Sequence, residues 1–274
     1  MAFQTEPEPS RGKAIEVLPG VLRITAENPG PMRYHGTNAY ILDDGADVVV
    51  IDPGPDDGKH LDTIVDAAGR ISLILLTHGH VDHAEGIRSL QKRTGAPLAA
   101  FYKSTSSDRV PDIALEDGSR VGSLTAIHTP GHAADHLCFA RGDGVLFSGD
   151  HVMAWCSTVV GPPPNGDMLG YFRSLQRLID RPDRVYAPGH GPLLHEPKPF
   201  VQELLDRRLA REQEILEALG RGLTRPDDIR SALYSKKTNP VLVNAAYRNV
   251  LSHLAKLVME GRVRELENET YILA

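Results

Sequence analysis

The feature that most constrains the fold is a repeated arrangement in which a short apolar run is followed at once by a polar cluster. Each run has the length of a β-strand and is bounded by Gly, Pro or Asp. Ligand sites favour the carboxyl ends of strands, where a rigid sheet aims loop residues into one crevice, so we expect the clusters to converge. The runs that end in such a cluster are 48–51, 73–76, 124–127, 145–147 and 185–187.

Helical patterns separate many of the apolar runs in the first two-thirds of the chain. Strands dominate early and helices are interspersed, which predicts sheets that are covered by helices. The expected helices span 59–68, 84–93 and 168–179, and further strands are expected at 21–24, 39–42, 71–76 and 137–140.

The composition changes near Pro197-Lys198-Pro199, after which the chain is rich in Leu, Glu and Arg. Three helices followed by a small hairpin are expected there, and this is the outline of a winged helix. The first helix is predicted over 201–219, the second begins after 224, and the third spans 240–259. The hairpin strands are predicted over 262–266 and 271–273. We therefore expect a polar N-terminal tail over 1–14, a catalytic domain over 15–200 and a winged-helix-like domain over 201–274.

Histidine and aspartate dominate the polar clusters, in a pattern suited to two metal ions. His78 and His80 alternate across one residue, so both can point at one ion from an extended loop, while Asp82 and His83 can face a second. Imidazole and carboxylate bind zinc at roughly 2.0–2.2 Å. The H-x-H-x-D-H pattern arises by chance on the order of once in 10^5 positions. The candidate ligands are His78, His80, Asp82, His83, His132, Asp150 and His190.

Composition sets the broad class of the protein. The net charge of −6 argues against a general nucleic-acid coat, and two cysteines are too few for a disulfide framework. The N-terminal stretch lacks an apolar signal core, and no apolar run has the length needed to cross a bilayer. We expect a cytoplasmic globular protein with no membrane partner.

Four motifs together resemble the metallo-β-lactamase superfamily over about residues 15 to 200. They are Thr77–His83, Pro130-Gly131-His132, Ser148-Gly149-Asp150 and Pro188-Gly189-His190-Gly191, and Asp52-Pro53-Gly54 fits the family's early strand-end motif. The resemblance implies an α/β fold, an αβ/βα four-layer sandwich with metals at one edge of its two sheets. It also implies a first metal on His78, His80 and His132, a second on Asp82, His83 and His190, and Asp150 as the bridge.

The C-terminal pattern is similar to the branch of β-lactamase-like protein 2 (LACTB2), whose members carry a winged-helix-like end and include endoribonucleases. We therefore expect a dinuclear metal-dependent hydrolase that uses a metal-activated hydroxide, with Asp82 as the catalytic residue that orients it. The first substrate hypothesis is single-stranded RNA. The alternative is a small-molecule ester or thioester, as in hydroxyacylglutathione hydrolase. Glyoxalase-type enzymes end in a helical glutathione-binding segment rather than a winged helix, and this difference favours RNA over the small-molecule substrate.

Several alternatives can be weighed from the sequence. True β-lactamases generally carry Cys where this chain has Asp150, and flavodiiron proteins carry Glu in place of His80, so both activities are disfavoured. A non-catalytic protein that kept the metal fold is opposed by the complete ligand set. The winged helix mixes acidic and basic residues, which favours a docking or dimer-forming module over a nucleic-acid binder. The sequence is compatible with a homodimer but does not determine the oligomeric state.

Two further expectations concern the metals and their surroundings. The cofactor should be two divalent ions, zinc ahead of iron or manganese, although the same ligand types accept all three. Asp52 should orient a ligand histidine rather than bind metal, because carboxylates commonly support zinc histidines in that way. Trp155 and Tyr171 are candidates either for a substrate groove or for the core.

Overall fold

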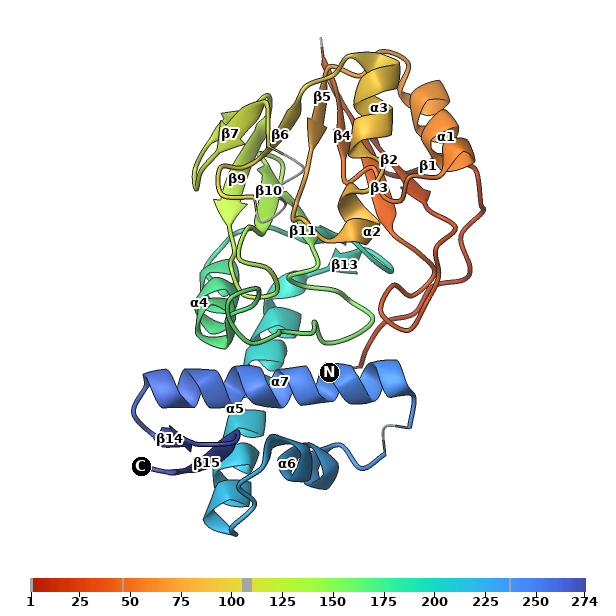
Figure 1. The fold of residues 1–274 in the computed structure, drawn as a ribbon. Coiled ribbons are helices and arrows are strands. Elements are labelled where there is room, and N and C mark those ends of the chain that lie inside the picture. The colour runs from red at the N-terminus through yellow and green to blue at the C-terminus, as the bar shows by residue number, and fades with distance from the viewer. Residues whose placement is uncertain (1, 46, 105–109, 237) are drawn as a thin grey trace. The chain divides into compact units, whose positions relative to one another are not determined.

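The computed structural model describes residues 2–45, 47–104, 110–236 and 238–274. The chain divides into two compact units (Figure 1). The first unit comprises Met1–Thr129, Asp135–Cys156 and Pro182–Pro197, and the second comprises Pro130–Ala134, Ser157–Arg181 and Lys198–Ala274.

A seven-stranded mixed sheet forms one half of the first unit, and its strands lie in the order of the sequence. Strands β1 to β4 pair antiparallel, and β4 to β7 pair parallel. The strands are β1 (Ile15–Leu18), β2 (Val21–Thr25), β3 (Asn38–Asp44), β4 (Asp47–Ile51), β5 (Leu73–Leu75), β6 (Leu98–Phe101) and β7 (Ile113–Leu115). Parallel strands need long crossovers, and helices supply the first two of them: α1 (Gly58–Ala68) joins β4 to β5, while α2 (Val81–Ala84) and α3 (Ile87–Thr94) join β5 to β6.

A six-stranded sheet forms the other half, in the order β13-β12-β11-β10-β9-β8. All neighbours are antiparallel except β11 and β12. Its strands are β8 (Arg120–Val121), β9 (Leu124–His128), β10 (Leu137–Arg141), β11 (Val145–Gly149), β12 (Val185–Pro188) and β13 (Leu194–His195). All the strands that precede a predicted polar cluster are present.

Alternate residues of a strand point to the same face of its sheet. Buried residues on one face of each sheet pack together in one hydrophobic core. On β3, Tyr40 packs edge-on against Phe147 of β11, with ring centroids 5.2 Å apart. The intervening residue, Ile41, faces the opposite way and packs in a second cluster with Leu61 of α1 and Leu90 of α3. Burial of one such side chain stabilises the fold by about 1.5–3 kcal/mol. This double packing holds the strand ends, and hence the polar clusters, at fixed positions.

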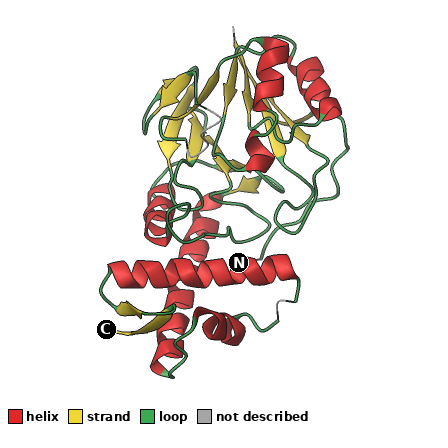
Figure 2. Ribbon diagram, in the orientation of Figure 1, coloured by secondary structure: helices red, strands yellow, loops and turns green. Residues whose placement is uncertain are grey.

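The described residues of the second unit form four helices and a two-stranded sheet, coloured by type in Figure 2. They are α4 (Met168–Ile179), α5 (Pro197–Gly220), α6 (Pro226–Leu233), α7 (Pro240–Met259), β14 (Val263–Leu266) and β15 (Thr270–Leu273). Ile215, Ile229 and Leu254 form the centre of its apolar core. Helix α5 begins four residues before its predicted start, because prolines are tolerated in a first helical turn. Helix α7 has its predicted bounds, and Asn239 caps it by accepting the N–H of Val241 at 2.9 Å.

Among the described helices, none combines the length and the apolar character that a bilayer span requires.

Candidate metal centre

The candidate ligands of the first unit lie in the segments that follow three strands. The loop after β5 carries His78 and His80, the helix α2 that follows it carries Asp82 and His83, and Asp150 follows β11. His190 follows β12, which runs parallel to β11, so these two loops leave the same edge of the sheet. Hydrogen bonds also join the two sheets at this edge: the N–H of Leu137 donates to Thr77 O at 2.7 Å, and that of Asn38 donates to Gly189 O at 2.8 Å.

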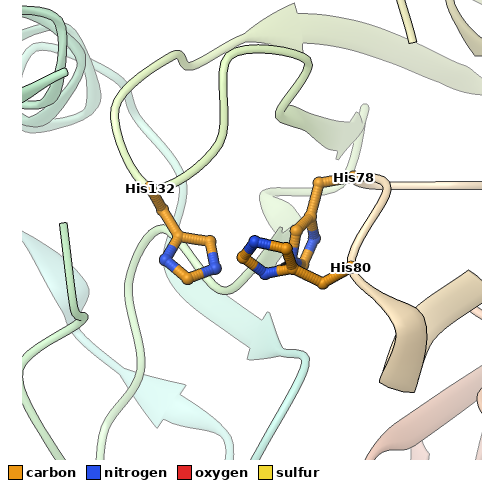
Figure 3. A group of neighbouring side chains, drawn as sticks. All are labelled: His78, His80 and His132. Atoms are coloured by element: carbon orange, nitrogen blue, oxygen red, sulfur yellow. Dashed lines mark hydrogen bonds between the residues drawn. The ribbon is translucent and has the colours of Figure 1, made fainter. Parts of the chain in front are cut away.

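The structure brings all the candidate ligands into three overlapping groups. Within each group, one possible ligand atom of every member lies within 4.8 Å of the others. Two groups lie inside the first unit and share His83. The third places His132 beside two histidines of the β5 loop (Figure 3). The groups are His78, His83 and Asp150; Asp82, His83 and His190; and His78, His80 and His132.

Asp52 organises two of the histidines from beneath. Its Oδ2 accepts a hydrogen bond from Nδ1 of His83 at 2.8 Å and one from the hydroxyl of Thr77 at 2.7 Å. The hydroxyl proton of Thr77 is therefore used, so its oxygen accepts from Nδ1 of His78 at 3.0 Å. In their neutral forms, both rings therefore carry the proton on Nδ1 and the lone pair on Nε2. The expectation that Asp52 orients a histidine agrees with this contact.

Backbone carbonyls fix two other histidines in the same tautomer. Nδ1 of His190 lies 3.0 Å from the carbonyl oxygen of Gly36, and Nδ1 of His132 lies 2.7 Å from that of Val159. A carbonyl oxygen can only accept, so each Nδ1 carries a proton, and Nε2 is the nitrogen with a lone pair when the ring is neutral. Nε2 of His190 faces Nε2 of His83 at 3.3 Å.

These contacts test whether the residues fit a pair of metal ions. Neutral imidazoles with one nitrogen tied to a carboxylate or carbonyl are the usual arrangement of metal-binding histidines. Carboxylate oxygens complete the set: Oδ2 of Asp150 lies 3.5 Å from Nε2 of His190, and Oδ1 lies 3.5 Å from Nε2 of His83. Nitrogen and oxygen donors that converge in this way fit divalent zinc, iron or manganese.

The charges of the ligand set shift its ionisation. Burial disfavours charge on Asp150, but the adjacent His190 and His83 hold its pKa well below the usual range. Burial likewise opposes charge on His190, yet Asp150 raises the pKa of that imidazole to about 9. The pKa of Asp82 is lowered against its burial by a hydrogen bond to His190. The carboxylates thus attract positive charge, which protons or metal ions can supply.

Close backbone approach is required at two glycines of the site. A Cβ on Gly189 would lie 2.6 Å from both Oδ1 of Asp150 and Cε1 of His83, so any larger residue would collide with two candidate ligands. Gly131 has φ +148°, and a Cβ there would lie 2.5 Å from Cα of Tyr171. Both positions are therefore restricted to glycine by the packing that places the ligands.

Exposure differs across the site. His80 is exposed, while Asp82 and His132 are partly exposed. His78, His83, Asp150 and His190 are buried.

Other predicted and unpredicted residues also surround the site. Tyr171 is fully buried against Gly131 and therefore belongs to the core rather than to a groove. Trp155 is partly buried, and its ring lies 5.0 Å from that of Tyr34. The hydrogen-bonding roles of Thr77, Gly36 and Val159 were not predicted. The role of Thr77 could have been predicted, because it directly precedes His78 in the sequence. The roles of Gly36 and Val159 could not, because each acts through a backbone carbonyl, which every residue has.

Two family descriptions match the chain. Residues 32–105 and 99–190 match the Metallo-beta-lactamase superfamily, and residues 226–270 match the Beta-lactamase associated winged helix domain.

Two curated relatives are each 33% identical to this chain. "Beta-lactamase-like protein 2 homolog" of Drosophila melanogaster is 33% identical, over 89% of this chain and 89% of its own. "Atrochrysone carboxyl ACP thioesterase" of Aspergillus fumigatus is also 33% identical, over 75% of this chain and 67% of its own.

Solved structures share the fold, which confirms the expected fold class. A Beta-lactamase domain protein from Burkholderia ambifaria has a TM-score of 0.82 at 21% identity, covering 97% of this chain and 95% of its own. TTHA1623 in a di-iron-bound form has a TM-score of 0.56 at 28% identity, covering 65% of this chain and 96% of its own. The chain belongs to the metallo-β-lactamase superfamily, as a metal-dependent hydrolase with a C-terminal winged helix domain that is related to the β-lactamase-like protein 2 homologues.

Proposed function

We propose that the chain hydrolyses acyl thioesters or related esters with two divalent metal ions. His78, His80 and His132 would hold the first ion. Asp82, His83 and His190 would hold the second, with Asp150 shared. The observation that carries the two-ion site is the shared tautomer: Nδ1 of His78, His83, His132 and His190 each faces an acceptor, which leaves Nε2 for a metal. The relative crystallised in a di-iron-bound form supports two ions and leaves zinc, iron and manganese as candidates.

When bound, two such ions lower the pKa of a shared water towards about 7 and polarise the group that is attacked. The chain's own residues orient the reactants. Asp82 is partly exposed, and its Oδ2 lies 3.4 Å from Nε2 of His190, which supports a role for its carboxylate in holding a proton of the attacking water. Asp52 keeps His83 in the tautomer that the site needs. Asp82 is therefore the proposed catalytic residue.

The names of relatives favour a thioester as substrate. "Atrochrysone carboxyl ACP thioesterase" describes the relative from Aspergillus fumigatus and also one from Aspergillus chevalieri, which is 29% identical over 91% of this chain. That second match extends well beyond the metal-binding part. Hydrolysis of a thioester needs only a hydroxide and a polarised carbonyl, which this site is suited to provide.

Single-stranded RNA is the second candidate, and the winged helix domain favours it. The charges of that domain and of α5 oppose it, because nucleic-acid binders concentrate positive charge on one face. Arg207, Arg211 and Arg230 instead pair with carboxylates, at 3.0, 2.9 and 2.8 Å. These pairs leave less positive charge for a phosphate backbone.

A parallel assay separates the candidates. Protein loaded with zinc, iron or manganese would be incubated with an acyl thioester, a lactone and a single-stranded RNA. We expect thioester cleavage that is lost in His83→Ala and kept in His195→Ala, an exposed histidine outside the groups. Cleavage of RNA alone would replace the thioester proposal with the second candidate, and cleavage of none of the three would contradict both.

A further inference from the structure

We infer that Arg208 of α5 and Asn249 of α7 are positioning residues for His132, because they hold the backbone segment that fixes its imidazole. The inference rests on the proposed role of His132 as a metal ligand. It gives the C-terminal helices a part in the metal site, in addition to any part in substrate binding. All the contacts below lie within the second unit.

The first contact joins His132 to the segment Thr158–Val160. Nδ1 of His132 donates to the carbonyl oxygen of Val159 at 2.7 Å. This short hydrogen bond sets both the tautomer and the orientation of the ring. A shift of the Val159 peptide would therefore turn Nε2 away from its metal.

Two side chains hold the peptides on either side of Val159. The guanidinium of Arg208 donates to the carbonyl oxygen of Thr158. Oδ1 of Asn249 accepts the N–H of Val160 at 3.1 Å, and it also accepts from Nη1 of Arg208 at 3.0 Å. The segment is thus tied on both sides of Val159 by one linked pair of side chains.

Burial makes this pair costly to disturb. Arg208 is 7% exposed and Asn249 is 9% exposed. A buried polar group that loses its partner costs about 1–3 kcal/mol, and a charged group costs more. Removal of Asn249 would leave both the Val160 N–H and part of the Arg208 guanidinium without their acceptor, so the segment would have to move to find others.

The same arginine supports the His132 turn from a second direction. Its guanidinium carbon lies 5.5 Å from the ring centre of Tyr171, whose backbone occupies the space beside Gly131. Gly131 directly precedes His132. Arg208 therefore contacts the residue before Val159, whose carbonyl bonds the imidazole, and the ring of Tyr171, whose backbone packs beside Gly131.

The test compares Asn249→Leu with Asn249→Asp in the full chain. Leucine keeps the size and loses the acceptor, whereas aspartate keeps an oxygen that accepts from both Val160 and Arg208. Binding of Co²⁺ would be titrated by its visible absorption, which reports the ligands of each ion. We expect Asn249→Leu to weaken one of two binding steps about 10–100-fold with an altered spectrum. Asn249→Asp should restore both the affinity and the spectrum.

Two further variants keep the test decisive. Val250→Ala alters the neighbouring α7 residue, which lies in the apolar core of the second unit, and it should lower stability without changing either binding step. Arg208→Lys keeps the charge and serves if Asn249→Leu does not fold; it should weaken the same step by about 3–10-fold, since one ammonium does not reproduce the guanidinium fork. An unchanged Co²⁺ titration in Asn249→Leu, or in Arg208→Lys where Asn249→Leu does not fold, would overturn the inference. Failure of the wild type to bind Co²⁺ would instead overturn the proposed function.

Discussion

Oδ2 of Asp52 accepts a hydrogen bond from Nδ1 of His83 at 2.8 Å, deep beneath the candidate metal site. Asp52 has φ 51°, a left-handed conformation that is uncommon for a residue other than glycine. Both of its oxygens are used, since Oδ1 also accepts the N–H of Thr77 at 2.8 Å. Such a conformation persists only where the surrounding contacts determine it. The carboxylate therefore supports His83 directly and His78 through Thr77.

Replacement of this carboxylate should weaken metal binding. In Asp52→Asn, the amide lacks the negative charge that holds the proton on Nδ1 of His83. We expect about 10–100-fold weaker binding of the ion held by His83, measured by competition with a chromophoric chelator. Asp47→Asn, at the exposed start of β4, the strand that Asp52 follows, is the control and should bind metal as the wild type does. Equal affinities in the two variants would show that Asp52 does not support the site.

Asp82→Asn tests the proposed catalytic residue. The amide keeps the size of the side chain but loses its charge, so the attacking water is held less well. We expect kcat to fall about 10²-fold or more, with a much smaller change in KM. Metal content would be measured on the same sample, so that loss of an ion is distinguished from loss of orientation. An unchanged kcat would remove Asp82 from the mechanism.

Gly189 offers a steric test that leaves all the ligands in place. In Gly189→Ala, the new methyl group would lie 2.6 Å from Oδ1 of Asp150, so the carboxylate must move. We expect a loss of metal binding of at least about 10-fold together with a loss of activity. Gly142→Ala is the matched control, because a Cβ there meets nothing within 4 Å. The proposed ligand geometry is contradicted if the two variants retain metal equally well.

His253 should make folding sensitive to pH. Burial lowers the pKa of this imidazole from 6.5 to about 4, and the charge of Arg208 contributes in the same direction while Glu212 opposes it. Below pH 6.5 the unfolded chain binds a proton that the folded chain binds only near pH 4. The free energy of unfolding therefore keeps the full contribution of His253 above pH 6.5. It falls by on the order of 3 kcal/mol as the pH falls towards 4.

Urea unfolding of the wild type and of His253→Gln at pH 7.5, 6, 5 and about 4 measures this loss. Glutamine does not titrate in the range, so the difference between the two proteins isolates the histidine from the carboxylates of the rest of the chain. The wild type should lose more stability than the variant on acidification. Parallel pH curves would contradict the lowered pKa.

The strand-end pattern explains how much of the site could be predicted. Residues such as His78 and Asp150 follow strongly apolar runs. Such a run predicts a strand that is buried on both faces of the sheet, and this fixes where the residue after it lies. The outer turns of α7 were equally predictable, because Asn239 and Pro240 are strong helix-start signals and Gly261 ends the pattern. Local chemistry at the strand and helix ends therefore carried most of the prediction.

The support of the histidines could not be predicted in the same way. The acceptor for His190 is the carbonyl oxygen of Gly36, and the acceptor for His132 is that of Val159. Every residue has a carbonyl, so its role depends on distant packing rather than on residue type. The start of α5 at Pro197 was missed for a different reason, because prolines are tolerated in a first helical turn and do not always mark the residues outside a helix.

The metal content of the purified protein tests the two-ion site most directly. The full chain would be produced with added zinc, iron or manganese and dialysed against metal-free buffer. Its metal content per chain would then be measured by elemental mass spectrometry. The site predicts two equivalents of divalent metal per chain in the wild type and fewer than one and a half in Asp150→Ala, which removes the shared ligand. A wild-type protein that retains no metal under any of the three conditions would contradict the two-ion site and the hydrolytic mechanism built on it.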